Sequence, residues 1–207
     1  MAIPLTQPLA PLFGSVALMA GLVLMTRRRA GALIGAGAVQ AWAAAGVAAV
    51  RGGLAGDAGL VAAALITLAA SGVAIPIALT LITRRRDAAP VSAPGSMGLG
   101  AALVGLAALA VPGVAIAGGA LTRESLAVAI AVGLLGALLV AMRRSPLAQL
   151  AGVLSLGNGV ILAATPGVPL IATVPLVALA PAALLLGAMG LGAVDLDAGA
   201  TPGSPGP

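Results

Sequence analysis

The sequence predicts an all-α membrane protein of about seven transmembrane helices. Hydrophobic residues make up 61% of the chain and charged residues only 7%, whereas a soluble domain carries roughly 25% charge. The apolar residues are gathered into stretches of the length that crosses a bilayer, about 20 residues. Short arginine runs separate several of these stretches. Lipid, and not water, is therefore the solvent that this composition suits.

Seven apolar stretches are candidate spans. They cover residues 8–26, 30–50, 58–83, 97–119, 125–142, 147–164 and 168–193. No positive charge precedes the first stretch and three arginines follow it, which is typical of a membrane anchor and not of a cleaved signal peptide. The expected organisation is a membrane domain over residues 1–193, followed by a Gly/Pro-rich cytoplasmic tail over residues 194–207.

The connections between the spans divide arginine unequally. Those after spans one, three and five hold eight arginines, namely Arg27, Arg28, Arg29, Arg84, Arg85, Arg86, Arg143 and Arg144. Those after spans two and four hold only Arg51 and Arg123. Because Lys and Arg gather on the cytoplasmic side of a membrane, the eight predict an outside N-terminus and a cytoplasmic C-terminus in a bacterial inner membrane.

The residue types exclude several kinds of chemistry. The chain has no Cys, His, Tyr or Lys, so the usual ligands of zinc, haem and iron–sulfur clusters are missing. A Cys–His nucleophile and base pair is excluded as well. All five acids and all ten arginines fall in loops or at span ends. We therefore expect no catalytic residue, no cofactor, no metal and no proton path within this chain. The net charge of +5 does not predict a nucleic-acid partner, because the arginines stand in short runs between apolar segments.

A few polar residues fall deep inside the predicted spans. Gln40, Ser71 and Asn158 are the main ones, and Thr67 and Ser155 accompany them. An amide in hydrocarbon must find a partner, and hydrogen bonds between helices contribute roughly 0.6–2 kcal/mol. Two interpretations stay open: these side chains join helices to one another, or they touch water or a lipid headgroup in the channel of a partner.

Proline and glycine also punctuate the spans. Prolines within spans are Pro76, Pro112, Pro175 and Pro181. Each lacks an N–H and predicts a kinked helix in which a neighbour satisfies the freed carbonyl. The run from Gly31 to Gly35 has the small-xxx-small spacing that is typical of closely packed helices.

An internal repeat is suggested by two stretches that run alike, residues 27–40 and 143–158. In their alignment Gly35 pairs with Gly152, and Gln40 with Gly157. The repeat predicts two three-helix units, spans one to three and five to seven, joined by span four. Both units would point the same way across the membrane, which makes the repeat a parallel one.

The run from Arg143 to Gly159 (RRSPLAQLAGVLSLGNG) resembles the hydrogenase-4 component E family, whose members are membrane subunits of formate hydrogenlyase and complex I-like assemblies. The similarity extends over residues 27–86 and 121–193, and it includes the mid-helix Gln40 and the Pro76 position. Gly157 stands where the family has the Glu of Leu-Glu-Asn-Gly, and the family's intramembrane Lys has no counterpart. The family's proton route is therefore not implied here.

The resemblance implies a non-catalytic membrane-arm subunit of a group 4 hydrogenase-related redox complex. Such a chain would pack beside antiporter-like proton-translocating subunits in the bilayer and would be an accessory subunit of a multi-subunit oxidoreductase. Two alternatives remain. The chain could be a small-solute permease that uses Gln40, Ser71 and Asn158, or a membrane anchor or assembly subunit of another membrane enzyme.

Overall fold

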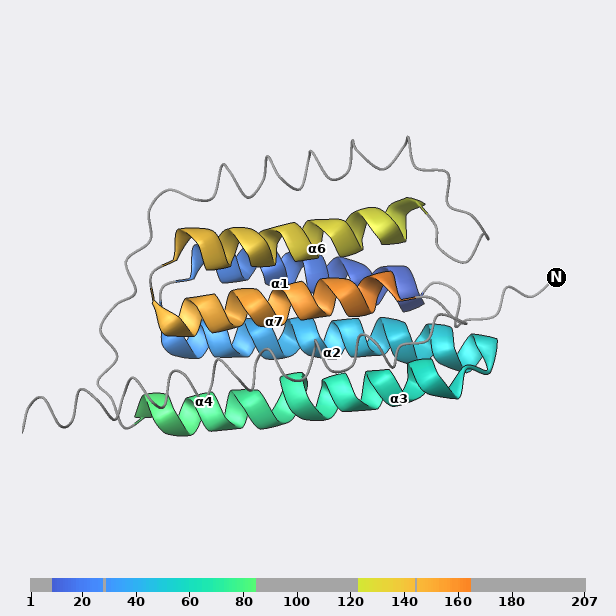
Figure 1. The fold of residues 1–207 in the computed structure, drawn as a ribbon, viewed down its shortest axis with the longest axis horizontal. Helices are drawn as coiled ribbons and strands as arrows, with labels where there is room; N and C mark the ends of the chain where they lie inside the picture. The colour runs from blue at the N-terminus through green and yellow to red at the C-terminus, as the bar shows by residue number, and fades with distance from the viewer. Residues whose placement is uncertain (1–8, 28, 85–122, 144, 165–207) are drawn as a thin grey trace, which may run out of the picture.

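The computed structural model of the chain describes residues 9–27, 29–84, 123–143 and 145–164, and all the regular structure in them is helical. The helices form rods that run along one long axis (Figure 1). Their bounds are α1 Leu9–Thr26, α2 Ala30–Ala55, α3 Ala58–Thr67, the π-helix η1 Leu68–Ala74, α4 Ile75–Arg84, α6 Arg123–Met142 and α7 Pro146–Ala163.

Four helical stretches are long and apolar enough to cross a membrane. They are Leu9–Thr26, Ala30–Ala55, Ala58–Leu81 and Ser125–Met142, and the apolar helix Leu147–Ala163 is slightly shorter. These five match the predicted spans one, two, three, five and six. The predicted spans 97–119 and 168–193 and the tail 194–207 lie outside the described residues.

Local capping fixes the turn between α2 and α3. Gly56 adopts the left-handed conformation at φ 68°, and Asp57 donates its backbone N–H to the Gly52 carbonyl at 2.9 Å. The Asp57 carboxylate then accepts from the N–H groups of Gly59 and Leu60 at 2.9 and 3.1 Å, which caps α3. Ser145 caps α7 in the same way, with Pro146 at the first helical position.

Helix α2 continues to Ala55 and so passes the predicted end of the second span at residue 50. Arg51 lies in this extension, and its Nη1 donates to the carbonyls of Leu162 and Ala164 at 2.7 and 3.2 Å. These two carbonyls lie at the end of α7, where no N–H of the helix can reach them. The Arg51 guanidinium supplies the missing donors. Arg51 therefore ties the end of α2 to the end of α7.

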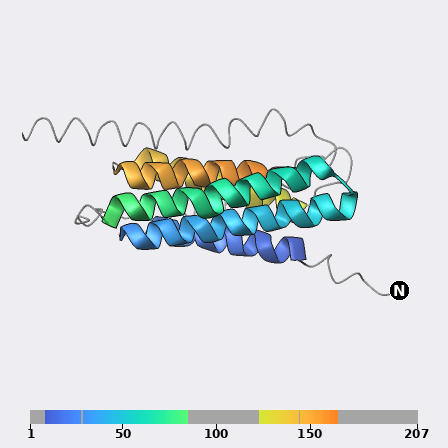
Figure 2. The ribbon, with the colours of Figure 1, turned by 90° about the horizontal axis from the view of Figure 1, so that it is seen from below.

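The α1–α2 and α6–α7 hairpins point the same way. An added Cβ at Gly14 would meet Val128 at 3.6 Å, and one at Gly21 would meet Leu135 at 3.2 Å, so the α1–α6 contacts advance together along both helices. Figure 1 shows the same directions. Figure 2 shows that the third helix, made of α3, η1 and α4 in succession, lies beside α2. The parallel three-helix repeat stays a prediction, because its last helix would be residues 168–193.

Close helix packing occurs at a different place from the one predicted. Gly31 and Gly35 have open space where a Cβ would stand, so their spacing serves no close crossing in the described part of the chain. Helices α6 and α7 instead meet through their backbones. A Cβ on Gly136 would lie 2.6 Å from the Gly152 carbonyl oxygen, and one on Gly159 would lie 2.8 Å from the Gly133 nitrogen. Gly152 and Gly35, paired by the predicted repeat, thus have different surroundings.

Four of the eight arginines predicted to share one side of the membrane stand at the end of the bundle where α1, α4 and α6 end and α2 and α7 begin (Figure 1). Arg27 and Arg29 are exposed there, and Arg84 is the last residue of α4. Arg143 lies at the same end but is only 2% exposed, and its Nη2 donates to the Met25 carbonyl at 2.8 Å. It therefore closes the end of α1 as well as adding charge. Arg28, Arg85, Arg86 and Arg144 lie outside the described residues.

The glycine contact between α6 and α7 predicts opposite effects for two alanine substitutions in the same helix. Gly136→Ala should cost about 1–3 kcal/mol, because the new methyl group overlaps the backbone of α7. Gly133→Ala meets open space and should gain up to about 1 kcal/mol from helix propensity. Thermal unfolding of both variants in detergent, followed by circular dichroism, measures the difference. Equal shifts of Tm in the two variants would contradict the contact.

Candidate functional site

The polar side chains predicted at depth are turned into the bundle. Gln40 is 0% exposed, Asn158 1% exposed, and Thr67, Ser71 and Ser155 are also buried. Lipid offers no hydrogen bonds, so an inward orientation is the arrangement that costs least. The ionisable side chains whose placement is described lie at helix ends instead, at Arg27, Arg29, Arg51, Asp57 and Arg143.

Gln40 joins α2 to α1. Its Nε2 donates to the Ala17 carbonyl at 3.3 Å. A Cβ on Gly21 would lie 3.0 Å from this Nε2, so the absence of a side chain on Gly21 leaves room for the amide. Gln40 Oε1 is buried and has no hydrogen-bond partner within the described helices. The amide is therefore only half satisfied there.

Helix α7 contributes two polar side chains to the interior. Ser155 Oγ donates to the Val132 carbonyl of α6 at 3.3 Å. One turn further along, Asn158 Nδ2 is buried and has no hydrogen-bond partner among the described residues. A buried amide donor without a partner costs about 1–3 kcal/mol. An acceptor close to Asn158 Nδ2 would remove this cost.

Gln40 and Asn158 belong to the same level of the bundle. Gly21 lies beside both Gln40 and Leu135, and Gly136, the next residue of α6, lies against Ser155 and Leu156 of α7. Asn158 follows within one turn of these residues, and α2 packs against α7. The structure thus brings an unpartnered acceptor, Gln40 Oε1, and an unpartnered donor, Asn158 Nδ2, into one layer. Which atom of an amide is O or N rests on its hydrogen bonds, so each amide can present either a donor or an acceptor to its surroundings.

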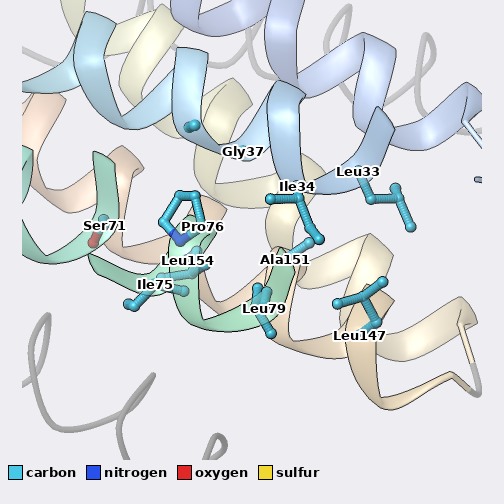
Figure 3. Close-up of a pocket in the computed structure, with 11 residues that line it drawn as sticks. Leu33, Ile34, Gly37, Ser71, Ile75, Pro76, Leu79, Leu147, Ala151 and Leu154 are labelled. Carbon is cyan, nitrogen blue, oxygen red and sulfur yellow. The ribbon is translucent and has the colours of Figure 1, made fainter. Parts of the chain in front are cut away.

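Ser71 belongs to a separate feature that neither amide borders. It lines a small cavity of about 10 Å³ between α2, η1, α4 and α7 (Figure 3). The other lining residues are apolar, among them Ile34, Ile75, Leu79 and Leu154. A cavity of this size holds about one water molecule, and a buried water needs two or more polar partners. The three predicted site residues therefore form two separate features, a pair of amides and a lone hydroxyl.

Trp42 is a site residue that the sequence reasoning did not single out. Pro76 has no N–H to give to the carbonyl four residues earlier, that of Gly72. Trp42 Nε1 of α2 donates to this carbonyl at 2.9 Å. The predicted rescue of a carbonyl freed by proline is therefore confirmed at Pro76. The available signal was the spacing from Pro76 to Gly72, whereas nothing in the sequence points to Trp42 as the donor.

The third helix is irregular at the same place. Residues Leu68–Ala74 form a π-helix, and the N–H of Ile75 donates to Ala70, five residues earlier. Gly72 is also the glycine that Trp42 requires, because a Cβ there would lie 2.5 Å from Trp42 Cδ1. Short π segments are rare in proteins as a whole, but they are found frequently at functional sites. The Trp42, Gly72 and Pro76 group is therefore a second candidate site.

Comparison with known proteins adds no further identification: no protein-family model, no curated protein and no solved structure matches this chain. The geometry alone defines the site as two buried amides in one layer and a proline-broken third helix held by Trp42.

The two amides should be energetically coupled. In a double-mutant cycle of Gln40→Leu and Asn158→Leu, we expect a coupling free energy of about 0.6–2 kcal/mol, as for other hydrogen bonds between membrane helices. Unfolding of the single and double variants in detergent by denaturant measures it. Ser15→Ala, which removes an exposed hydroxyl bonded within its own helix, serves as the control. Additive effects within about 0.3–0.5 kcal/mol would show that the amides do not meet.

Proposed function

We propose that this chain is a non-catalytic membrane-arm subunit of a complex I-like redox complex, related to group 4 hydrogenases and formate hydrogenlyase. It would pack beside antiporter-like proton-translocating subunits in a bacterial inner membrane. The support is the resemblance of residues 143–159 to the hydrogenase-4 component E family. These residues include the turn after α6, and helix α7, with Asn158 buried in the polar layer.

The observation that favours an accessory role most is the distribution of polar groups. Ser155 and the Nε2 of Gln40 bond to backbone carbonyls of neighbouring helices, and the described ionisable side chains stand at helix ends. Proton paths through membranes use ionisable residues at depth. Gly157, where the family has Glu, is half-buried in α7 and supplies no carboxylate. A chain built in this way joins helices and leaves proton transfer to its partners.

A small-solute permease is the second candidate. The two unpartnered amide atoms, Gln40 Oε1 and Asn158 Nδ2, favour it, because a polar guest could satisfy both. The cavity beside Ser71 is too small for such a guest, at about 10 Å³. Flux of a neutral solute into vesicles that contain only this protein would favour the permease over the subunit.

A tagged copy of the full chain should co-purify with partners. After gentle detergent extraction and mass spectrometry, we expect antiporter-like membrane subunits and iron–sulfur subunits at close to one copy each per tagged chain. An unrelated polytopic protein with the same tag, expressed to the same level, is the control. Recovery of the chain alone or as a homo-oligomer would overturn the proposal, and substoichiometric recovery would point to an assembly factor.

The orientation follows from the arginines and can be tested in the same membranes. The chain lacks cysteine, and Gly31 and Gly53 are exposed with open space for a side chain at opposite ends of α2. We expect an impermeant maleimide to label Gly53→Cys in intact spheroplasts, and Gly31→Cys only after permeabilisation. The reverse pattern would mean that the Arg-rich end faces outward.

A further inference from the structure

The third helix has an unusual combination of features at its centre. It passes from α3 through the π-helix η1 into α4, with Pro76 just beyond η1. Its only described side-chain donor from another helix at this point is Trp42, bonded to the Gly72 carbonyl at 2.9 Å. Helices bend or change register at proline and at π turns. The junction between η1 and α4 is therefore the place where this rod can move.

A π turn accommodates one extra residue, so each α4 residue sits where its predecessor would sit in an uninterrupted α-helix. Relaxing η1 to α geometry would turn α4 by about 100° around its axis and shift it by about 1.5 Å. Ile75 and Leu79 now face the cavity beside Ser71 and pack with Leu150 and Leu154 of α7. After the turn, Ala74 and Ala78 would take their places.

This exchange changes the size of the cavity, because two large side chains give way to two methyl groups. In the observed state Ile75 and Leu79 are buried, and the space beside Ser71 is about one water molecule in size (Figure 3). In the turned state the wall formed by α4 would retreat, and the Ser71 hydroxyl would border a larger space. The observed geometry is thus the closed one of the two.

The polar groups of α4 allow it to turn as a unit. Thr80 Oγ1 donates to the Pro76 carbonyl at 2.7 Å, and Thr83 Oγ1 donates to the Leu79 carbonyl at 2.8 Å. Both hydroxyls are satisfied within α4 itself, so rotation leaves these bonds intact. The outward residues Ile77 and Leu81 are apolar and exposed in the present state. Turning therefore places no unsatisfied polar side chain of α4 in lipid.

Trp42 distinguishes the two states. Gly72 lies within η1, so relaxing η1 moves its carbonyl away from Trp42 Nε1 and opens their close contact. Pro76 offers this carbonyl no N–H in either state, so the bond to Trp42 stabilises the π state selectively. We propose that the third helix is a two-state switch in which the Trp42–Gly72 hydrogen bond holds α4 closed over the cavity, and relaxation of η1 turns α4 and opens it.

Disulfide trapping in the naturally cysteine-free chain tests the proposal on the full protein in proteoliposomes. The pair Leu79→Cys with Leu154→Cys reports the closed state, since these side chains share one cluster. The pair Ala78→Cys with Leu154→Cys reports the open state. Ile77→Cys with Leu154→Cys is the background, because Ile77 faces outward.

Three variants test how the ratio of open to closed cross-links depends on Trp42 and on η1. Trp42→Phe keeps a ring and loses the donor, and the ratio should rise about fivefold, the effect of losing one ordinary hydrogen bond. Val39→Ala, on the same side of the groove lined by Trp42, should leave it unchanged. Deletion of Ala70 removes the extra residue of η1 and should keep the closed pair dominant even when Trp42→Phe is added, because an uninterrupted α-helix then leaves Leu79 in its present place.

The result that overturns the proposal is equally definite. If Trp42→Phe and Val39→Ala give the same ratio, Trp42 does not hold the closed state. If the Ala70 deletion gives a folded, monodisperse protein in which the open pair dominates, the extra residue of η1 does not set the rotation of α4. Size-exclusion chromatography establishes folding for each variant before cross-linking.

Discussion

A polar group inside a bilayer has no water to bond with, and the described structure depends on that constraint. The helices satisfy most backbone groups by themselves, and the exceptions are met by particular side chains. Trp42 meets the Gly72 carbonyl that Pro76 leaves free, Arg51 meets the end of α7, and Arg143 meets the end of α1. Each of these bonds joins two different helices. The same hydrogen bonds therefore satisfy free backbone carbonyls and hold the helices of the bundle together.

The way helices pack follows from the shortage of large side chains. Where glycine faces glycine, α6 and α7 approach to backbone contact, and dispersion forces and weak backbone contacts replace the hydrophobic effect that is lost in lipid. Around α2 the packing is different, because Gln40, Trp42 and Arg51 each reach to a different neighbour. Helix α2 is thus the central element, and it contributes one residue to each candidate site, Gln40 to the first and Trp42 to the second.

The two candidate sites differ in what they can do. The amide layer of Gln40 and Asn158 sits among packed helices, where a satisfied pair would fix the register of α2 against α7. The third helix has a proline, a π turn and an adjacent cavity, so it has the elements of a moving part. In the proposed role as an accessory subunit, the first would hold the shape of the chain and the second would respond to a partner.

The sequence by itself determined that the chain is helical and apolar and where five of the helices lie, because composition and span length decide these without packing. It also placed Gln40, Ser71 and Asn158 within the spans, and the structure shows that all three are buried. Only the tertiary structure decided that Ser71 lines a cavity that neither amide borders, that Gly136 and Gly152 make the close crossing instead of Gly31 and Gly35, and that Trp42 partners Gly72. The reason is that these depend on how helices rotate about their axes, and in a chain rich in Ala and Gly the hydrophobic pattern leaves that rotation open.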